Sequence, residues 1–379
     1  MDKKLNWINI IKYAGAYIAF IIGSGFATGQ EIIQFFTSQG VFSLGAILIS
    51  MVLYAWVGGA MTDIGFHHRE QAKANAYSIV CGKWLGTFYE YFVRVFLFAV
   101  VVVMISGAGA TLNEYYGMNY YVGSLFMALL IFLAFACGFS KLIDIIGCIG
   151  PVIIVFSIIV AIGSIASDGN LQLATDVSQL ADMQASPYWW VSGMLYAAYN
   201  IFGAVPFLMT MGAEAGSGRE VRIGGFLGGI VLMGAVLFMN MALILRTELA
   251  ATYAVPTLQL AKDLSPVLGA VFSVILLCGI FSTAAPMMWT VCSKLAGVGT
   301  KKSLIVAAVL TAIAFGLGQL PFGTLVGIIY PYTGYLGILL LACLAVYRVK
   351  AVRKKGLSVK TDCREENVQC LEATKSETY

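Results

Sequence analysis

The stretch AFIIGSGFATGQE, residues 19–31, lies inside the first apolar segment of the chain. Apolar residues lead into it, three glycines then follow within seven residues, and the carboxylate of Glu31 closes it. In hydrocarbon an unpaired backbone amide is so costly that an interrupted helix persists only where protein or a polar cavity satisfies the freed groups. The stretch therefore predicts a broken membrane helix beside a binding site.

A second interpretation of the same stretch is close helix packing. Small residues such as Gly23 and Gly25 are common where membrane helices touch. A site built from inverted repeats additionally requires a second broken helix at the matching place in the other half of the chain. The order of the remaining segments therefore decides between the two interpretations.

The composition places the chain among multi-pass membrane proteins. Of its 379 residues 60% are hydrophobic and only 11% are charged, and the mean hydropathy is +0.87. A soluble core does not need so much apolar sequence. Residues 1–8 are expected to be a short cytoplasmic N-terminus, and no small-residue cleavage site follows the first apolar run, so a retained first helix is expected.

Ten apolar runs are long enough to cross about 30 Å of hydrocarbon, which takes roughly 20 helical residues. They lie near 9–36, 41–66, 87–112, 119–137, 142–166, 188–213, 222–245, 266–294, 303–319 and 322–347. The fold class predicted is therefore all-α, with a transmembrane domain at 9–347. Residues 348–379 are charged and poor in aromatics, which predicts a disordered tail.

The distribution of basic residues predicts the orientation in the membrane. Lysine and arginine gather in alternate loops and after the last span, whereas the loop 167–187 holds three aspartates and no basic residue. Basic loops stay on the cytoplasmic side, so both termini are expected to be cytoplasmic. The net charge of +4 follows from this topology and requires no nucleic-acid partner.

A fixed offset of about 180 residues relates the two halves of the chain, roughly 9–166 and 188–347. Each half holds five helices, and because five is odd, the second half must enter the membrane from the opposite side, as an inverted repeat does. By this offset the first break should recur near 203–207. Asn200, Gly203 and Pro206 lie there, which predicts that the sixth helix is unwound between Asn200 and Pro206.

With these features the sequence resembles the amino acid/polyamine/organocation superfamily and its neurotransmitter:sodium symporter relatives, which share the five-plus-five fold of the bacterial leucine transporter. The run from Gly23 to Glu31 is similar to bacterial permeases of the YkvI type. The resemblance covers about residues 9–348. It implies a sodium-driven symporter of a small solute in the bacterial plasma membrane, working by alternating access without cofactor or enzymatic activity.

The resemblance also implies a substrate site. A substrate carboxylate would dock on backbone amides at the first break, where a half-helix N-terminus is partly positive, and the second break would form the other wall. The residues implied are Gly23, Ser24, Gly25, Phe26, Tyr199, Asn200 and Phe202. The alternative for Tyr199 is an aromatic that only fills the core. Sparse charge around the breaks favours a zwitterion such as an amino acid.

A sodium site is implied where the eighth helix passes the first break. The resemblance places the ion between backbone carbonyls and adjacent hydroxyls, here those of Ala19, Ile22, Gly279, Ser282 and Thr283. An all-oxygen shell suits a hard cation. The alternative is that both hydroxyls bond to a carbonyl one turn back. Proton coupling is the less favoured option, because residues 147–163 hold no ionisable group except a thiol.

Glu31 has three possible roles: to gate the vestibule, to pair with a substrate amine, or to take up a proton, since charges at membrane depth are costly and usually functional.

Other classes of function remain open to different degrees. A receptor could use the same fold. An enzyme is not expected, because the only histidines are the neighbours His67 and His68.

Overall fold

The computed structural model describes residues 5–137, 143–167, 177–297 and 300–376, and this part of the chain is helical with connecting turns. The helices are α1 (Trp7–Ile21), α2 (Ser24–Thr28), α3 (Gln30–Phe35), η1 (Thr37–Phe42), α4 (Ser43–His67), α5 (Arg69–Ala74), α6 (Ala76–Tyr116), α7 (Tyr120–Cys137), α8 (Ile143–Ser167), η3 (Ser178–Met183), α9 (Trp189–Glu214), α10 (Gly218–Ile244), α11 (Thr247–Thr252), α12 (Pro256–Leu264), α13 (Pro266–Ala296), α14 (Lys301–Leu317) and α15 (Phe322–Ser376).

Each of the ten predicted apolar runs coincides with a helix, or in the case of 9–36 with the series α1, α2 and α3. Within the described residues, 6 helices are long and apolar enough to cross a membrane: parts of α4, α6, α9, α10, α13 and α15. Shorter apolar helices cover Trp7–Ile21, Tyr120–Ala136 and Val152–Ser167. The prediction of an all-α membrane protein is confirmed, while the inverted repeat stays a prediction.

The first helix is broken, as predicted, but over fewer residues. After α1 ends, Ile22 (φ −70°, ψ 104°) and Gly23 (φ −107°, ψ −170°) are extended, and the helical α2 follows at once. Gly29 then takes a left-handed conformation with φ 85°, which only glycine adopts at little cost. This second interruption turns the chain from α2 into α3.

The predicted break in the sixth helix is wrong: α9 is continuous from Trp189 to Glu214 and passes through Asn200 and Pro206. Pro206 has no amide to donate to the carbonyl of Phe202, one turn back. The hydroxyl of Tyr77 on α6 donates to that carbonyl instead, at 2.5 Å. A proline is tolerated in a membrane helix when another group satisfies the freed carbonyl, so α9 need not unwind.

Glycines bring the backbones of α4, α9 and α10 into direct contact. A Cβ atom built on Gly58 of α4 would overlap the carbonyl of Gly225 on α10, and one built on Gly212 of α9 would overlap the carbonyl of Thr62 on α4. Backbone atoms cannot turn aside as a flexible side chain can. These three helices therefore form a tightly packed unit of the kind that small residues allow in membranes.

Another face of α10 holds α1. A Cβ atom on Gly224 would lie 2.6 Å from the Cβ of Tyr13, so glycine is required for this approach too. At the start of α1, Glu220 accepts hydrogen bonds from the backbone amide of Asn6 and the side chain of Asn9, both at 2.9 Å. The first half of the broken helix is thus attached to the α4–α9–α10 unit.

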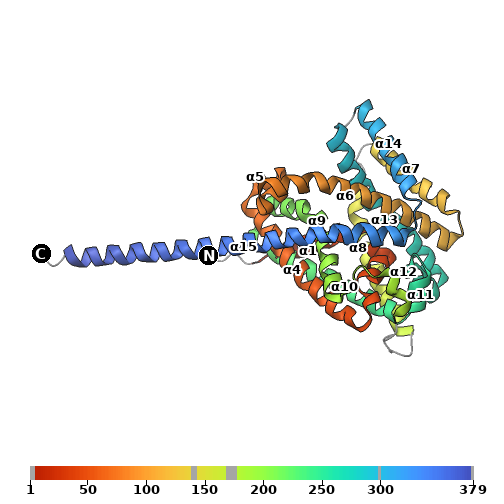
Figure 1. The fold of residues 1–379 in the computed structure, drawn as a ribbon, viewed down its shortest axis with the longest axis horizontal. Coiled ribbons are helices and arrows are strands. Elements are labelled where there is room, and N and C mark those ends of the chain that lie inside the picture. The colour runs from red at the N-terminus through yellow and green to blue at the C-terminus, as the bar shows by residue number, and fades with distance from the viewer. Residues whose placement is uncertain (1–4, 138–142, 168–176, 298–299, 377–379) are drawn as a thin grey trace.

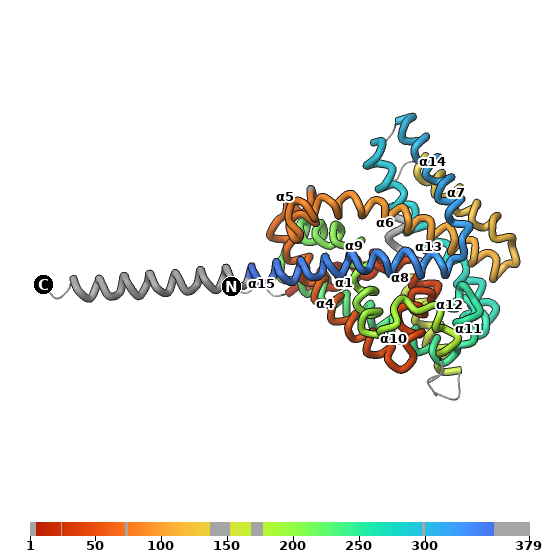
Figure 2. Tube along the Cα trace, viewed as in Figure 1, coloured from red at the N-terminus to blue at the C-terminus, as the bar shows by residue number. Residues whose placement is uncertain are grey.

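The short helices α11 and α12 lie at the end of the bundle opposite α5 (Figure 2). Glu114 at the end of α6 accepts hydrogen bonds from the backbone amides of Ala254 at 2.6 Å and Val255 at 3.0 Å. Thr257 of α12 donates to the carbonyl of Ala27 at 2.5 Å. The α11–α12 segment therefore covers the broken helix and links it to α6.

The last helix, α15, continues to Ser376 and leaves the bundle at the end where α5 lies (Figure 1). Only its first part, Phe322–Ala351, has the composition of a membrane span. Most helical stability in proteins comes from packing of one face against other elements, so a helical backbone alone does not decide whether this segment is ordered in solution. The disorder expected for residues 348–379 stays a prediction.

Candidate functional site

A cavity of about 50 Å³ lies beside the break between α1 and α2. A single buried water needs roughly 10–15 Å³ by this measure, so the cavity has room for a few waters or the head of a small solute. Its lining residues come from both sides of the break and from α6, α9, α13 and α15. They are Phe20, Ile21, Gly23, Glu31, Phe96, Leu97, Val100, Met104, Tyr199, Asn200, Gly203, Thr283, Met287 and Tyr330.

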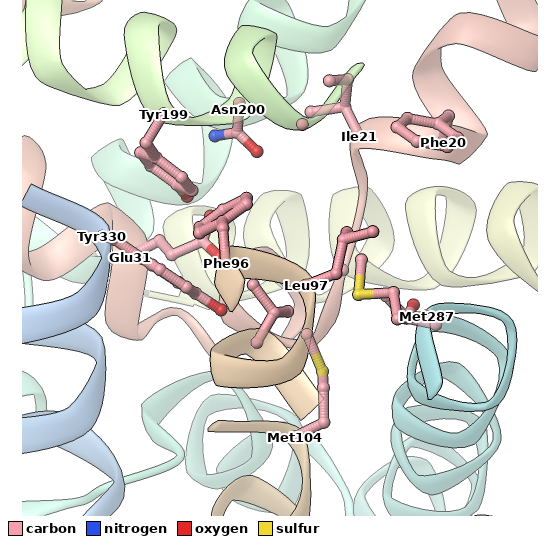
Figure 3. A pocket seen from close by; sticks show the side chains of 14 residues that line it. Phe20, Ile21, Glu31, Phe96, Leu97, Met104, Tyr199, Asn200, Met287 and Tyr330 are labelled. Carbon is pink, nitrogen blue, oxygen red and sulfur yellow. The ribbon is translucent and has the colours of Figure 1, made fainter. Parts of the chain in front are cut away.

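The two sides of the cavity differ in chemistry. Glu31 and Tyr330 lie on one side with Tyr199 above them, whereas Met287 and Phe20 lie on the other (Figure 3). A solute with one polar end and an apolar body would match this division, since binding sites for small molecules combine apolar walls with a few placed polar groups.

Glu31 is the charged residue of this lining, and only 6% of it is exposed. The left-handed turn at Gly29 starts α3, and Glu31 lies in the first turn of that helix. From there its side chain reaches back over α2, so that a Cβ atom built on Gly25 would overlap the carboxylate. The protein's own carboxylate thus occupies the space beside Gly25 where a substrate carboxylate was expected.

Tyrosines cluster beside the Glu31 carboxylate. Tyr199 and Tyr330 line the cavity together with Glu31, and the ring of Tyr196 packs against those of Tyr199 and Tyr54. The rings of Tyr199 and Tyr330 stack with centroids 4.6 Å apart and an angle of 10°. The Tyr199 hydroxyl lies beside the carboxylate but outside hydrogen-bond geometry. Among the described residues it has no hydrogen-bond partner, and the same is true of the buried Tyr54 hydroxyl.

Among the described residues, no positive side chain pairs with this carboxylate. None of the described lining residues is a lysine, arginine or histidine, and the ion pairs between described residues do not include Glu31. A buried charge is costly unless it is paired. The site therefore favours either a proton on Glu31 or a positively charged occupant.

The structure brings together part of the predicted substrate site. Gly23, Tyr199 and Asn200 line the cavity. Phe202 does not: it packs against Tyr77, Tyr89, Phe92 and Phe96 in an aromatic cluster of the core. Phe202 points elsewhere because α9 is helical, so residues 199, 200 and 203 share the cavity face and residue 202 does not.

Two other predicted substrate residues, Gly25 and Phe26, are not among the described lining residues. Phe26 is buried, with 2% exposed, and it is not among the lining residues. The backbone of Ser24 belongs to α2, and its side chain lies outside the described part of the chain. The expected docking of a carboxylate on the α2 amides stays a prediction, and with five residues this helix offers only a small dipole.

The predicted sodium ligands lie on α1, at its C-cap residue Ile22, and on α13, and α13 packs against α2 next to the break. A Cβ atom on Gly23 would lie 3.8 Å from the Thr283 methyl group. The hydroxyls of Ser282 and Thr283 both donate to the carbonyl of Gly279, at 2.9 and 3.0 Å. This is the bonding that the alternative interpretation expects, although each oxygen keeps lone pairs for a cation. Sodium binding, with Ala19 and Ile22 as further ligands, stays a prediction.

Sequence reasoning missed Tyr330, Met104 and Met287, which line the cavity from α15, α6 and α13. Single tyrosines and methionines in apolar helices carry no pattern that distinguishes a cavity wall from the core. For Tyr330 one signal was available, because it precedes Pro331, which the repeat pairs with Pro151.

Comparisons with known proteins agree with this architecture. No family model matches the sequence. The chain is 24% identical over 347 residues to the uncharacterized membrane protein YkvI of Bacillus subtilis, covering 91% of this chain and 97% of that protein. It is 23% identical over 344 residues to the uncharacterized protein YyaD of the same organism, covering 90% and 98%. The chain is a distant homologue of both.

Solved structures identify the fold. A manganese transporter from Eremococcus coleocola matches with a TM-score of 0.55 at 13% identity, over 92% of this chain and 80% of that one. Mhp1 in an inward-facing conformation matches with a TM-score of 0.54 at 13% identity, over 89% and 75%. The protein has the leucine-transporter fold, a fold of secondary transporters.

Proposed function

We propose that this protein is a secondary transporter of a small organic solute that carries a protonated amine, and that the solute passes through the cavity at the first break. The observation that carries this proposal is Glu31: a buried carboxylate, without a basic partner among the described residues, on the wall of a cavity beside a broken helix. The leucine-transporter fold supports transport by alternating access.

Sodium is the coupling ion that we propose. The position of Thr283 against Gly23 at the break supports this choice, because it brings one predicted ligand residue to the end of an interrupted helix, where the last carbonyls have no partner within the helix. A proton is the alternative, and Glu31 favours it to the extent that a buried carboxylate without a partner can carry one. Amino acids, which are zwitterions of the kind expected from the sequence, and simple amines are both substrates to test.

Transport and sensing can be separated with purified protein in liposomes. Single amino acids and amines are added outside under an inward gradient of either sodium or protons, and accumulation is measured. Accumulation that requires the sodium gradient and is lost in Glu31→Gln is the result expected. Glu248→Gln, which removes an exposed carboxylate on α11, should transport normally. A probe that binds but never accumulates under either gradient would show a receptor instead.

A further inference from the structure

The candidates outside the cavity are weaker. A surface hollow near the start of α10 contains Arg219 and Arg222, but Asp63 lies in it as well. The central cavity, by contrast, combines burial, one charge and the Tyr199 hydroxyl, which has no hydrogen-bond partner among the described residues. It also contradicts part of what the sequence led us to expect of the substrate.

We infer that the solute binds as an organic cation without a carboxylate, as a primary amine with an apolar body, and not as an amino acid. This inference rests on the proposed function only in taking this cavity as the binding site. Its starting point is that the Glu31 carboxylate fills the space over Gly25. The protein itself supplies the carboxylate that an amino acid would bring.

A second carboxylate would have no stabilising partner here. Like charges that share a buried site disfavour each other, and no described lining residue is basic. Backbone amides at the start of α2 are the remaining source of positive potential, but α2 has five residues, and the effect of a helix dipole depends on aligned peptide units. An amino acid in this cavity would therefore place its carboxylate in the negative electrostatic potential of Glu31.

An ammonium group, in contrast, finds partners on several sides. It has three hydrogen atoms to donate and accepts none. The Glu31 carboxylate and the Tyr199 hydroxyl oxygen, which lacks a partner among the described residues, are acceptors beside the cavity. The stacked rings of Tyr199 and Tyr330 add π faces, to which cations are attracted.

The rest of the cavity selects for an apolar body. Phe20, Met104 and Met287 line it away from Glu31 (Figure 3). Methionine side chains adapt to irregular apolar shapes, so the cavity can accept a branched alkyl or aromatic group when it opens. A strongly hydrated polyamine would leave its second charge against these side chains without a partner.

The test compares each amine with the amino acid that differs from it by one carboxylate. The probes are 3-methylbutylamine against leucine and 2-phenylethylamine against phenylalanine, titrated calorimetrically into the purified full-length protein at constant sodium chloride. We expect at least one amine to bind about tenfold or more tightly than its partner, the size of one lost charge-assisted interaction. Equal or tighter binding of the amino acids would overturn the inference and leave the transport function intact.

Variants test whether Glu31 causes the preference for the amine over the amino acid. Glu31→Gln keeps the shape of the side chain and removes its charge, so the amine should lose about tenfold or more in affinity, whereas Glu248→Gln should keep it. Gly25→Ala offers a second variant that displaces the same carboxylate without changing it. The inference is wrong if neither variant weakens binding of the amine. It is also wrong if no probe binds, while sodium chloride alone stabilises the wild-type protein but not the Glu31→Gln variant. Failure of both binding and accumulation would reject the proposed function as well.

Discussion

Glu31 and Gly25 act as a pair, because the side chain of one occupies the space that a side chain on the other would need. The overlap is with the far end of a flexible side chain, which can move away at modest cost. A change at Gly25 is therefore expected to act on the site more than on the fold. This is the residue-scale feature that separates a binding role from a packing role.

Gly25→Ala should lower amine affinity while the free energy of unfolding changes by about 1 kcal/mol or less. Affinity and melting temperature are measured on the same preparation. Gly234→Ala is the matched control, since a Cβ atom there meets nothing within 4 Å. Parallel loss of stability and binding in Gly25→Ala would favour the packing interpretation.

Ser282→Ala and Thr283→Ala test the sodium site. Each removes one oxygen that could coordinate a buried cation, so stabilisation of the purified protein by sodium chloride, compared with potassium chloride, should shrink. Thr290→Ala is the control, because its hydroxyl donates to the Pro286 carbonyl of the same helix at 2.8 Å in an exposed position. Unchanged sodium dependence in both site variants would exclude these two residues as ligands.

The sequence could reveal those site residues whose type is itself informative about the backbone. Gly23 could be found because three glycines cluster at residues 23–29 and Gly203 lies at the repeat offset from it, and Asn200 could be found because asparagine is unusual in an apolar helix. Met104 and Met287 could not be found, since their role depends on which way α6 and α13 face. For Glu31 the sequence indicated a function, but only the turn at Gly29 shows that the carboxylate points to Gly25.

At the scale of elements, α9 shows why a broken helix cannot be predicted from a proline alone. Proline marks a missing donor, but whether the helix unwinds depends on what replaces that donor. Here the Tyr77 hydroxyl replaces the missing donor, and Tyr77 lies 125 positions before Phe202, whose carbonyl it satisfies. In the first helix the break predicted from the glycines is present at Ile22 and Gly23.

Tyr77→Phe should lower the free energy of unfolding by about 1–3 kcal/mol, because it leaves the carbonyl of Phe202 buried without a donor. Adding Pro206→Ala restores a backbone amide there, so the tyrosine change should cost less in that background. Thermal unfolding of the four proteins in one detergent completes the cycle. Tyr91→Phe, at a position 63% exposed, is the control. Equal costs in both backgrounds would show that Tyr77 does not compensate for the proline.

At the scale of the whole molecule, the number and position of the apolar runs were predictable because bilayer thickness fixes the length of a spanning helix. All ten runs coincide with helices. What the sequence could not show is how the helices pack, since the contacts depend on which glycine faces which carbonyl.

The orientation of the chain is testable with fusions. A fluorescent protein attached after Ser376 should fold and fluoresce, and alkaline phosphatase at the same point should be inactive, because a cytoplasmic C-terminus is expected. Truncated fusions at Met118, in the turn between α6 and α7, should show the reverse. The opposite pattern at both points would invert the proposed topology.

The glycine contacts of α10 have a mechanical consequence. Helices whose backbones touch cannot slide past each other without overlap, so α4, α9 and α10, with α1 attached at Gly224, are expected to move as one rigid body. The pivots available to it are the non-helical residues Ile22, Gly23 and Gly29. Glu31 on α3 belongs to the same body as Tyr199, because Ser192 of α9 donates to the Phe35 carbonyl at 2.7 Å. The pivots therefore lie on either side of α2, and a rocking movement would carry Glu31 and Tyr199 together past this helix, so that the path opens while the solute stays on its carboxylate.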